Sequence, residues 1–236
     1  MHSNRLGLKV GRVLLSNTLN TNKVCAVIPF FNEAIHIQKI IDECSVYVDH
    51  IFAVNDGSTD GSEKKVIFND KVTLISYYPN KGKGYALNEG FKKSVKEKYN
   101  VTVTIDADLQ HSPKYIPLLV KELKNFDFVI GNRLTDFNTM PFPRIISNRL
   151  TSFLLSLKTK QKILDSQSGF RAYRTEIFNS LLPKFNGFEA ESEIIILAIR
   201  KNFRIGFAVI PTIYGNEKSK MKSLKTIFGF LKILFI

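Results

Sequence analysis

Residues 101–113 read VTVTIDADLQHSP, an apolar run followed by a polar one. Its first half alternates apolar β-branched residues with threonine, which predicts a buried β-strand beginning at Val101. Three polar residues then follow on alternate positions, Asp106, Asp108 and Gln110. Because side chains alternate along an extended chain, these three lie on one side. Two carboxylates and an amide oxygen are hard ligands that suit Mg²⁺ or Mn²⁺ with positions left open for phosphate oxygens.

The same residues have a plainer interpretation. A polar loop often only leads into a helix, with Ser112 as the N-cap and Pro113 at the first helical position. Ligands in open α/β sheets bind at the carboxyl ends of strands, which is where the three polar residues fall. The pattern alone leaves a metal site and a simple helix cap both open.

Strands and helices alternate through the first half of the chain. Besides the strand from Val101, buried strands are predicted at 23–30, 50–55, 72–78 and 126–130. Apolar spacing typical of helices occupies 33–47, a stretch ending near Lys98, and 113–124. This order predicts an α/β fold with a mainly parallel central sheet and helices on both faces. The polar loops that follow the strands should line a single cleft.

The second half is less regular. Residues 145–157 have apolar side chains at helical spacing, and residues 187–201 predict a helix entered through acidic residues. The polar segment 165–171 lies between helical segments, and 205–213 is predicted to be extended. The last stretch, 221–236, predicts a basic amphipathic helix that lies on a membrane, or else an ordinary helix packed on the core.

Composition limits the class of partner. The 236 residues include 34 Lys and Arg against 21 Asp and Glu, a net charge of +13. Such a balance favours nucleic acid, nucleotide phosphates or an anionic membrane face, although a merely basic soluble protein has the same balance. The acidic loops and the lack of an aromatic-basic RNA motif argue against nucleic acid.

Cysteine use and hydropathy indicate the compartment. Cys25 and Cys44 form neither a disulfide framework nor a metal motif, which favours a reducing compartment. No apolar run is long enough to span a bilayer, and the N-terminus is a poor signal peptide. We therefore expect a cytoplasmic protein, peripheral on the membrane.

The turn NKGKG, residues 80–84, follows the third strand. Lys81 and Lys83 flank Gly82, where the backbone permits close approach, so these lysines either meet phosphate or are simply solvated. The chain has no GxxxxGK[ST] sequence, and no GxGxxG follows its first strand, which argues against a P-loop and a Rossmann dinucleotide site.

Seven short motifs occur in order: VIPxxNE (27–33), VNDGSTD (54–60), NxGKG (80–84), DADxQ (106–110), GNR (131–133), DSQSGFR (165–171) and IYGNEKSK (213–220). Together they resemble family 2 glycosyltransferases, and within these the dolichyl-phosphate mannose synthase and polyprenyl-phosphate glycosyltransferase branch. The resemblance covers about residues 23–225. It implies a GT-A (Rossmann-like) fold and inverting transfer from a UDP- or GDP-sugar to a polyprenyl phosphate. The implied division is an extension (1–22), a GT-A domain (23–220) and a membrane-associating helix (221–236).

The resemblance also assigns roles to residues. It places Asp108 on the metal with Gln110 nearby, and Asp106 facing the nucleotide. Donor contacts are implied for Pro29, Glu33, Asp56, Lys83, Asp106, Lys218 and Lys220. The acceptor region corresponds to Arg133, Arg144, Ser147, Asp165 and Arg171. Relatives usually have an arginine ahead of the final Ser-Lys pair, where this chain has Lys218.

Transfer to a polyprenyl phosphate, as the resemblance implies, needs cationic groups around the acceptor and no general base. A sugar hydroxyl acceptor must lose a proton to a general base, whereas a lipid phosphate is already anionic at neutral pH. Arg133 and Arg144 would hold such an acceptor in line, and the metal would hold the departing diphosphate.

Two alternatives stay open. If Asp165, or one of the glutamates at 189, 191 and 193, faces the metal site, it would be a general base for a saccharide hydroxyl acceptor. We expect instead that Asp165 organises its loop beneath Arg133. The second alternative is a non-catalytic nucleotide- or lipid-binding module, which intact Asp106, Asp108 and Gln110 argue against.

Overall fold

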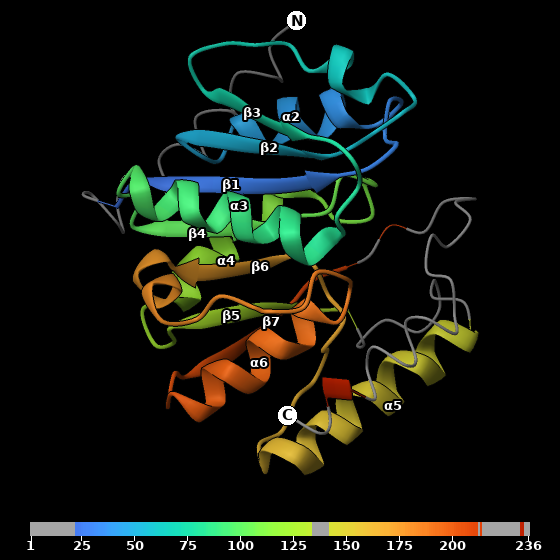
Figure 1. The fold of residues 1–236 in the computed structure, drawn as a ribbon. Helices are drawn as coiled ribbons and strands as arrows, with labels where there is room; N and C mark the ends of the chain where they lie inside the picture. The colour runs from blue at the N-terminus through green and yellow to red at the C-terminus, as the bar shows by residue number, and fades with distance from the viewer. Residues whose placement is uncertain (1–21, 134–141, 212, 214–231, 234–236) are drawn as a thin grey trace, which may run out of the picture.

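The computed structural model describes residues 22–133, 142–211, 213 and 232–233. Within these residues the chain forms one seven-stranded sheet in the order β3-β2-β1-β4-β6-β5-β7, which Figure 1 shows from top to bottom. The strands are β1 Val24–Phe30, β2 His50–Asp56, β3 Val72–Tyr77, β4 Val101–Thr104, β5 Phe128–Asn132, β6 Arg171–Arg174 and β7 Ile205–Val209.

Most neighbouring strands are parallel, and one strand is reversed. β1 pairs in parallel with β2 and β4, β2 with β3, and β5 with β7. β6 runs antiparallel to both β4 and β5, with Thr104 opposite Arg171. No strand was predicted from the sequence at the position of β6. Because β6 is reversed, the segment that precedes it lies at the edge where β1, β2 and β4 end, which we call the carboxyl edge.

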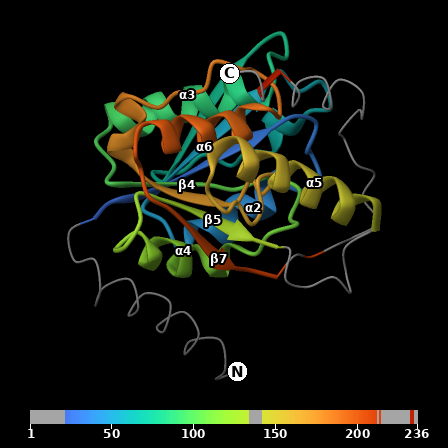
Figure 2. The same ribbon diagram turned by 90° about the horizontal axis from the view of Figure 1, so that it is seen from below.

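Helices cover both faces of the sheet, as predicted (Figures 1 and 2). On one face lie α2, Ile37–Ser45, and α4, Ile116–Glu122, which follows a 3₁₀ turn at Pro113–Tyr115. On the other lie α3, Lys83–Lys96, and α6, Ala190–Arg200. Short 3₁₀ helices span Ser62–Lys65 and Thr175–Asn179.

The alternation of β1 side chains explains the two layers. Ala26 and Ile28 are buried in the cluster beneath α2 and α4, whereas Cys25 and Val27 are buried in the cluster beneath α3 and α6. Both faces of the central strand are therefore apolar, which is typical of a strand covered on both sides.

Close packing sets the position of α3 on the sheet. A Cβ built on Gly90 would lie 2.3 Å from a methyl group of Val27, so only glycine permits this approach of helix to strand. Phe91, next in the helix, stacks on Phe178 with ring centroids 3.9 Å apart. This packing places the first residue of α3, Lys83, at the carboxyl edge of the sheet.

The two cysteines are free and buried, as the sequence analysis expected. Burial raises the pKa of the Cys25 thiol to about 12 and also raises that of Cys44. Both thiols therefore behave as small apolar side chains of the core.

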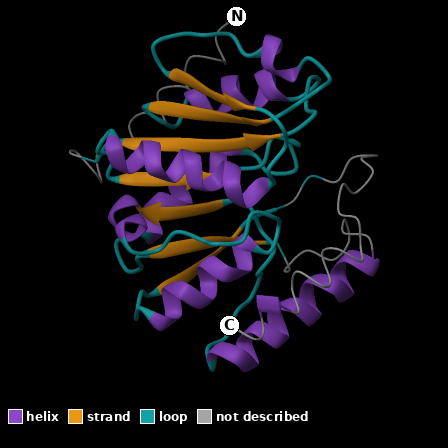
Figure 3. Cartoon of the chain, viewed as in Figure 1, coloured by secondary structure: helices purple, strands orange, loops and turns teal. Residues whose placement is uncertain are grey.

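The long helix α5, Phe142–Thr159, lies beside the lower part of the sheet and extends away from it (Figures 1 and 3). No helix among the described residues combines the length and the apolarity needed to cross a bilayer.

Several predicted segments fall outside the described residues. These are the extension at 1–21, the basic loop with Lys218 and Lys220, and most of the predicted C-terminal helix. Of that helix, only Lys232 and Ile233 are described; both are helical, and Ile233 is buried in the cluster beneath α3 and α6. The three-part division of the chain stays a prediction.

Candidate active site

The carboxylate of Asp56, at the end of β2, is buried and holds the turn before α3. It accepts hydrogen bonds from Asn80 Nδ2 at 2.8 Å, from the Lys81 backbone N–H at 2.8 Å and from that of Gly82 at 2.9 Å. Asp56 therefore has a structural task at the carboxyl edge. The contact of Asp56 with the nucleotide sugar stays a prediction.

The two glycines of the NKGKG turn pack closely against another segment of the protein, where a side chain would not fit. The backbone N–H of Gly84 donates to the Asn186 carbonyl oxygen at 2.7 Å, and that of Tyr85 donates to the same oxygen at 3.3 Å. A Cβ on Gly82 would lie 2.3 Å from this oxygen, so the close backbone approach serves the 185–187 segment. The ammonium of Lys81 lies 4.4 Å from the centre of the Tyr85 ring.

Lys83 forms a buried triad with two carboxylates. Its Nζ lies 2.6 Å from Asp106 Oδ1 and 2.9 Å from Glu191 Oε1, and its side chain is only 13% exposed. Burial alone would lower the pKa of Lys83, but the two carboxylates outweigh it and raise that pKa. Burial alone would raise the pKa of Asp106, but Lys83 holds it below its usual value. In this arrangement Lys83 pairs with acids and is not simply solvated.

The three polar residues that follow β4 lie in one loop at the carboxyl edge. The chain turns at 107–108 and Leu109 has a φ of 59°, so the extended alternation predicted for these side chains does not hold. Asp106 Oδ2 would lie 2.4 Å from a Cβ on Gly169, so the absence of a side chain at 169 makes room for this carboxylate. Thr104 Oγ1 donates to the Gly169 carbonyl oxygen at 2.8 Å, which fixes the approach. The backbone N–H of Gln110 donates to Asp108 Oδ1 at 3.1 Å.

The oxygen atoms of Asp106, Asp108 and Gln110 fit a divalent cation that has few protein ligands. Among the described residues, no group of three or more His, Cys, Asp or Glu side chains is arranged to hold a metal ion. One oxygen of Asp106 is paired with Lys83, whereas Asp108 and Gln110 are both partly exposed. One or two oxygen ligands with substrate phosphates are a usual set for Mg²⁺. The site therefore suits a cation shared with a bound diphosphate.

A cavity of about 370 Å³ adjoins this loop; its lining residues are Lys39, Glu43, Asp108, Leu109, His111, Ser112 and Ile213. His111 is fully buried, and burial lowers its pKa to about 4, so its imidazole is neutral at pH 7. The backbone N–H of Ile213 donates to the Gln110 carbonyl oxygen at 3.0 Å. The segment leading to the basic loop is therefore attached to the acidic loop.

Arg133 and Asp165 form a two-pronged ion pair. Arg133 Nε donates to Asp165 Oδ2 at 2.8 Å and Nη2 donates to Oδ1 at 2.9 Å. The Arg133 backbone N–H also donates to Oδ2, at 3.1 Å. Asp165 is fully buried, and although burial would raise its pKa, Arg133 lowers it overall. As expected, Asp165 organises its loop beneath Arg133.

Arg171 lies in the interior. Its guanidinium donates to the carbonyl oxygens of Ser168 at 2.6 Å, Glu191 at 2.8 Å and Ser166 at 2.9 Å. The side chain is fully buried, so this placement does not support the acceptor contact expected of Arg171. It orders the loop around Asp165 from within.

The other predicted residues lie on separate elements. Pro29 is buried in β1, and Glu33 Oε2 lies 2.9 Å from His36 Nδ1. Ser147 is exposed on α5; the side chain of Arg144, on the first turn of the same helix, lies outside the described set.

The glutamates near α6 have different surroundings. Glu193 Oε2 accepts from the backbone N–H groups of Lys184 and Phe185, at 2.8 and 2.9 Å, while Glu189 packs against Gly187. Only Glu191 of these three is linked to Asp106, through Lys83. Glu191 was a candidate base from the sequence, but its link to Lys83 was not predictable, because no local pattern relates α3 to α6.

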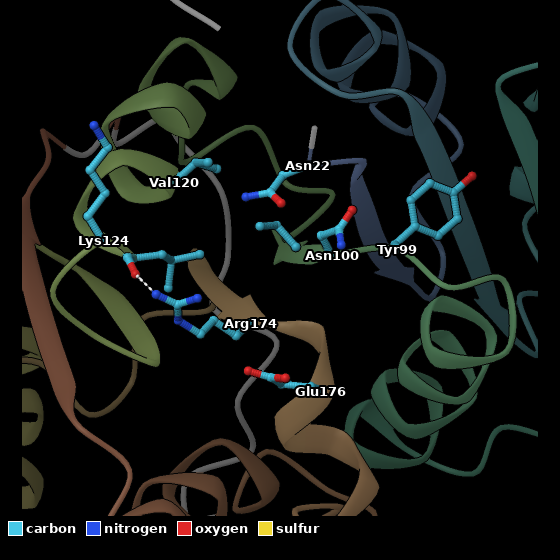
Figure 4. Close-up of a pocket in the computed structure, with 9 residues that line it drawn as sticks. Asn22, Tyr99, Asn100, Val120, Lys124, Arg174 and Glu176 are labelled. Carbon is cyan, nitrogen blue, oxygen red and sulfur yellow. Dashed lines mark hydrogen bonds between the residues drawn. The ribbon is translucent and has the colours of Figure 1, made fainter. Parts of the chain in front are cut away.

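A second cavity, of about 280 Å³, lies at the opposite edge of the sheet, where Val101 begins β4. Figure 4 shows its polar lining, with Asn100, Arg174 and Glu176 around the opening. Arg174 Nη2 donates to the Leu123 carbonyl oxygen at 2.6 Å, so its guanidinium is already used within the fold. This cavity is remote from the acidic loop.

Comparison with known proteins identifies the family. The family described as Glycosyl transferase family 2 matches residues 25–182. A UDP-N-acetylglucosamine–dolichyl-phosphate N-acetylglucosaminyltransferase of Methanococcus voltae is 30% identical over 86% of this chain and 90% of its own. A dolichol-phosphate mannosyltransferase of Pyrococcus furiosus is 31% identical over 90% of this chain and 63% of its own.

Solved structures agree on the fold. Glucosyl-3-phosphoglycerate synthase from Mycobacterium tuberculosis, in complex with Mn²⁺, UDP and glucosyl-3-phosphoglycerate, superposes with a TM-score of 0.70 at 20% identity, covering 96% of this chain and 81% of that one. At this identity the likeness concerns the fold alone, and it confirms the predicted GT-A architecture. With the family match over well more than half of its length, the chain is a member of the family 2 glycosyltransferases.

Proposed function

We propose that this enzyme transfers a hexose, with inversion, from a UDP- or GDP-sugar to a polyprenyl phosphate at the cytoplasmic face of the membrane. One observation carries the proposal: the Arg133–Asp165 pair lies at the same edge as the acidic loop and is joined to a helix with an exposed apolar face. The names of the two dolichyl-phosphate transferases among its relatives support this acceptor class.

The exposed face of α5 suits a lipid surface. Four large apolar side chains follow one another at helical spacing and are each 51–61% exposed: Ile146, Leu150, Phe153 and Leu157. The opposite face is buried and partly polar; there the Ser166 backbone N–H donates to Ser152 Oγ at 3.0 Å. Because Ser166 adjoins Asp165, the helix is fastened to the loop that pairs with Arg133. An amphipathic helix held in this way can lie in a membrane interface with its apolar face outward.

The chemistry requires no proton removal. An oxygen of the acceptor phosphate attacks C1 of the sugar, the bond from C1 to the β-phosphate oxygen breaks, and the nucleoside diphosphate leaves with the electron pair. Both reactants are anionic, so cationic side chains must hold them together and in line. Arg133 is suited to the acceptor phosphate, with Asp165 fixing the plane of its guanidinium.

Two further cations belong to the proposed donor site. Lys218 and Lys220 follow Ile213 by five and seven residues, and the Ile213 backbone N–H is bonded to Gln110. At 3.3–3.6 Å per residue, a fully extended chain would carry them no farther than about 25 Å from this bond. Both lysines can therefore reach a diphosphate bound at the acidic loop.

We assign the metal, Mg²⁺ or Mn²⁺, to Asp108 and Gln110, with Asp106 beside them. When bound, it would neutralise charge on the leaving diphosphate. Asp106 has a different neighbour in Lys83, which agrees with the nucleotide-facing role implied for it.

The test is sugar transfer by the purified chain, with Mn²⁺ or Mg²⁺, a panel of UDP- and GDP-sugars and a short polyprenyl phosphate. We expect metal-dependent formation of a polyprenyl-phosphate sugar. Asp108→Ala should abolish it, while the exposed Asp70→Ala, remote from the acidic loop, should not. Transfer only to a saccharide hydroxyl would refute the acceptor, and nucleotide binding without any transfer would favour a binding module.

A further inference from the structure

One polar side chain beside the acidic loop is buried without a hydrogen-bond partner. His111 directly follows Gln110 and is only 3% exposed. Among the described residues, neither of its ring nitrogens has a partner, and of the two only Nδ1 is shut off from solvent. Buried polar groups in proteins are nearly always hydrogen-bonded, because an unpaired one costs free energy. The imidazole therefore lacks a partner that the described part of the fold does not supply.

Packing holds the ring in place but does not explain why it is a histidine. The ring centroid lies 5.5 Å from that of buried Phe170, with the two ring planes at 38°. The Phe170 carbonyl oxygen accepts a hydrogen bond from the Gly131 backbone N–H at 2.9 Å, so the surface beneath the ring is itself fixed. A phenylalanine at 111 would fill the same space without burying an unpaired nitrogen.

The charges around His111 belong to both halves of the candidate site. Four charged groups are near enough to act electrostatically on the ring: Arg133, Asp165, Asp106 and Lys83. The first two form the ion pair assigned to the acceptor, and the other two form the pair on the nucleotide side. The imidazole is therefore close to the places proposed for both anionic substrates.

The cavity of about 370 Å³ gives a ligand access to the ring. Its lining combines His111 with the Lys39 ammonium and the Ser112 hydroxyl, and with two acids. Of these acids, Glu43 lies one turn from Lys39 on α2, and Asp108 is assigned to the cation. Since Nδ1 is enclosed, Nε2 is the nitrogen that meets the open space. We assign the proton of the neutral ring to Nε2, because an unpaired N–H is rarer inside proteins than an unpaired acceptor.

We propose that His111 Nε2–H donates a hydrogen bond to a phosphate oxygen of a bound substrate. The inference rests on the proposed function and adds a binding residue to it. Both substrates offer this chemistry, one as the diphosphate of the nucleotide sugar and the other as the phosphate of the polyprenyl acceptor. Anionic oxygens are the strongest acceptors for such an N–H. The partner that the ring lacks in the free protein is then supplied by the substrate.

Three substitutions of His111 separate packing from hydrogen bonding. His111→Phe keeps a ring against Phe170 and removes both nitrogens. His111→Gln retains an amide N–H near the position of Nε2, whereas His111→Asn places one near the position of Nδ1. If the residue only packs, Phe is tolerated best; if it donates from Nε2, Gln is tolerated best. His50→Phe, at the start of β2 on the opposite edge, is the matched control.

Calorimetry with Mn²⁺ gives the Kd of UDP and of GDP, and steady-state kinetics gives the KM of a short polyprenyl phosphate. We expect His111→Phe and His111→Asn to raise one of these constants at least about tenfold, the loss of one hydrogen bond to a charged group. A raised nucleotide Kd assigns the bond to the diphosphate, and a raised KM alone assigns it to the acceptor phosphate. His111→Gln should keep the same constant within about threefold of wild type, and His50→Phe should leave it unchanged. In urea unfolding, His111→Phe should be at least as stable as wild type, because it buries no unpaired nitrogen.

The outcomes separate this inference from the proposed function. Unchanged nucleotide Kd and KM in folded His111→Phe overturn it, and so does an equal loss in His111→Phe and His111→Gln. If His111→Phe does not fold, equal constants for the Gln and Asn variants overturn it. A protein that binds a nucleotide but transfers nothing to polyprenyl phosphate refutes the proposed acceptor, and the nucleotide Kd alone then decides the role of His111. A protein that binds neither nucleotide refutes both.

Discussion

Replacing Asp165 with asparagine removes the negative charge that faces the Arg133 guanidinium inside the protein. The carboxylate is fully buried and receives three hydrogen bonds from Arg133, two from the guanidinium and one from the backbone. Asparagine has nearly the same shape and retains one oxygen. The substitution therefore isolates the loss of charge from the loss of packing.

The expected cost follows from burial. Removing one partner of a buried ion pair costs about 3–5 kcal/mol, because the other charge stays desolvated without compensation. Since the asparagine side chain would still accept one hydrogen bond, we expect the lower end, about 3 kcal/mol, or about two orders of magnitude in the folding equilibrium. A matched control is Glu97→Gln, which breaks a half-exposed pair with Lys93 and should cost about 0.3–0.5 kcal/mol.

Urea unfolding followed by circular dichroism measures both variants. Arg133 holds the pKa of Asp165 below the unfolded value of about 3.9, although burial opposes this. The stabilisation by Asp165 is therefore complete above about pH 4 and is lost as the pH falls through the folded pKa. The difference between wild type and Asp165→Asn should be constant from pH 6 to 8 and shrink toward pH 3. A cost below about 1 kcal/mol at pH 7, or a difference independent of pH, would refute this reasoning.

Three further variants or treatments test other parts of the site and core. Gly169→Ala should weaken Mn²⁺-dependent nucleotide binding at least about tenfold, since its Cβ would lie 2.4 Å from Asp106 Oδ2; normal binding would contradict the assigned geometry. Burial raises the pKa of Glu193, so its stabilisation is present at low pH and lost as the pH rises through the folded pKa. Thermal melts of Glu193→Gln should lack this decline, which begins above the usual glutamate pKa; a decline that persists in the variant would show that another group causes it. Cys25 and Cys44 should resist a thiol reagent in the native protein and react only on unfolding; rapid native labelling would contradict their burial.

Much of the first half of the fold follows from local pattern. The strands β1, β2 and β3 begin and end within about one residue of the predicted ranges. For β1 and β2 the reason is that a strand buried on both faces is a nearly continuous apolar run. The edge strand β3 is only partly buried and alternates apolar with polar residues. The predicted strand at 126–130 corresponds to β5, Phe128–Asn132. The strand β6, Arg171–Arg174, has only four residues, two of them arginine, and no local pattern distinguishes it from a loop.

Part of the candidate site was predictable from the sequence and part was not. The sequence was sufficient to place Asp106, Asp108 and Gln110 in a loop at a strand end, and the ordered motifs were sufficient to predict the family. The extended alternation expected of these three side chains does not hold, because the chain turns at 107–108 and Leu109 has a φ of 59°. The partners of the lysine in NKGKG were not predictable. Lys83, Asp106 and Glu191 are far apart in the chain, and they meet only because α3, β4 and α6 converge at one edge.

The layered α/β class, the acidic loop and the membership of the glycosyltransferase family were therefore predictable from residues read along the chain. Those features depend on periodicity and on residues close together in the chain. The folded arrangement was needed to show that Asp56 and Arg171 support loops from within, that Lys83 pairs with two acids, and that the apolar face of α5 is exposed. These features depend on which segments meet after the reversed strand β6 joins the sheet, and an apolar stripe at helical spacing is the same in sequence whether it faces the core or the solvent.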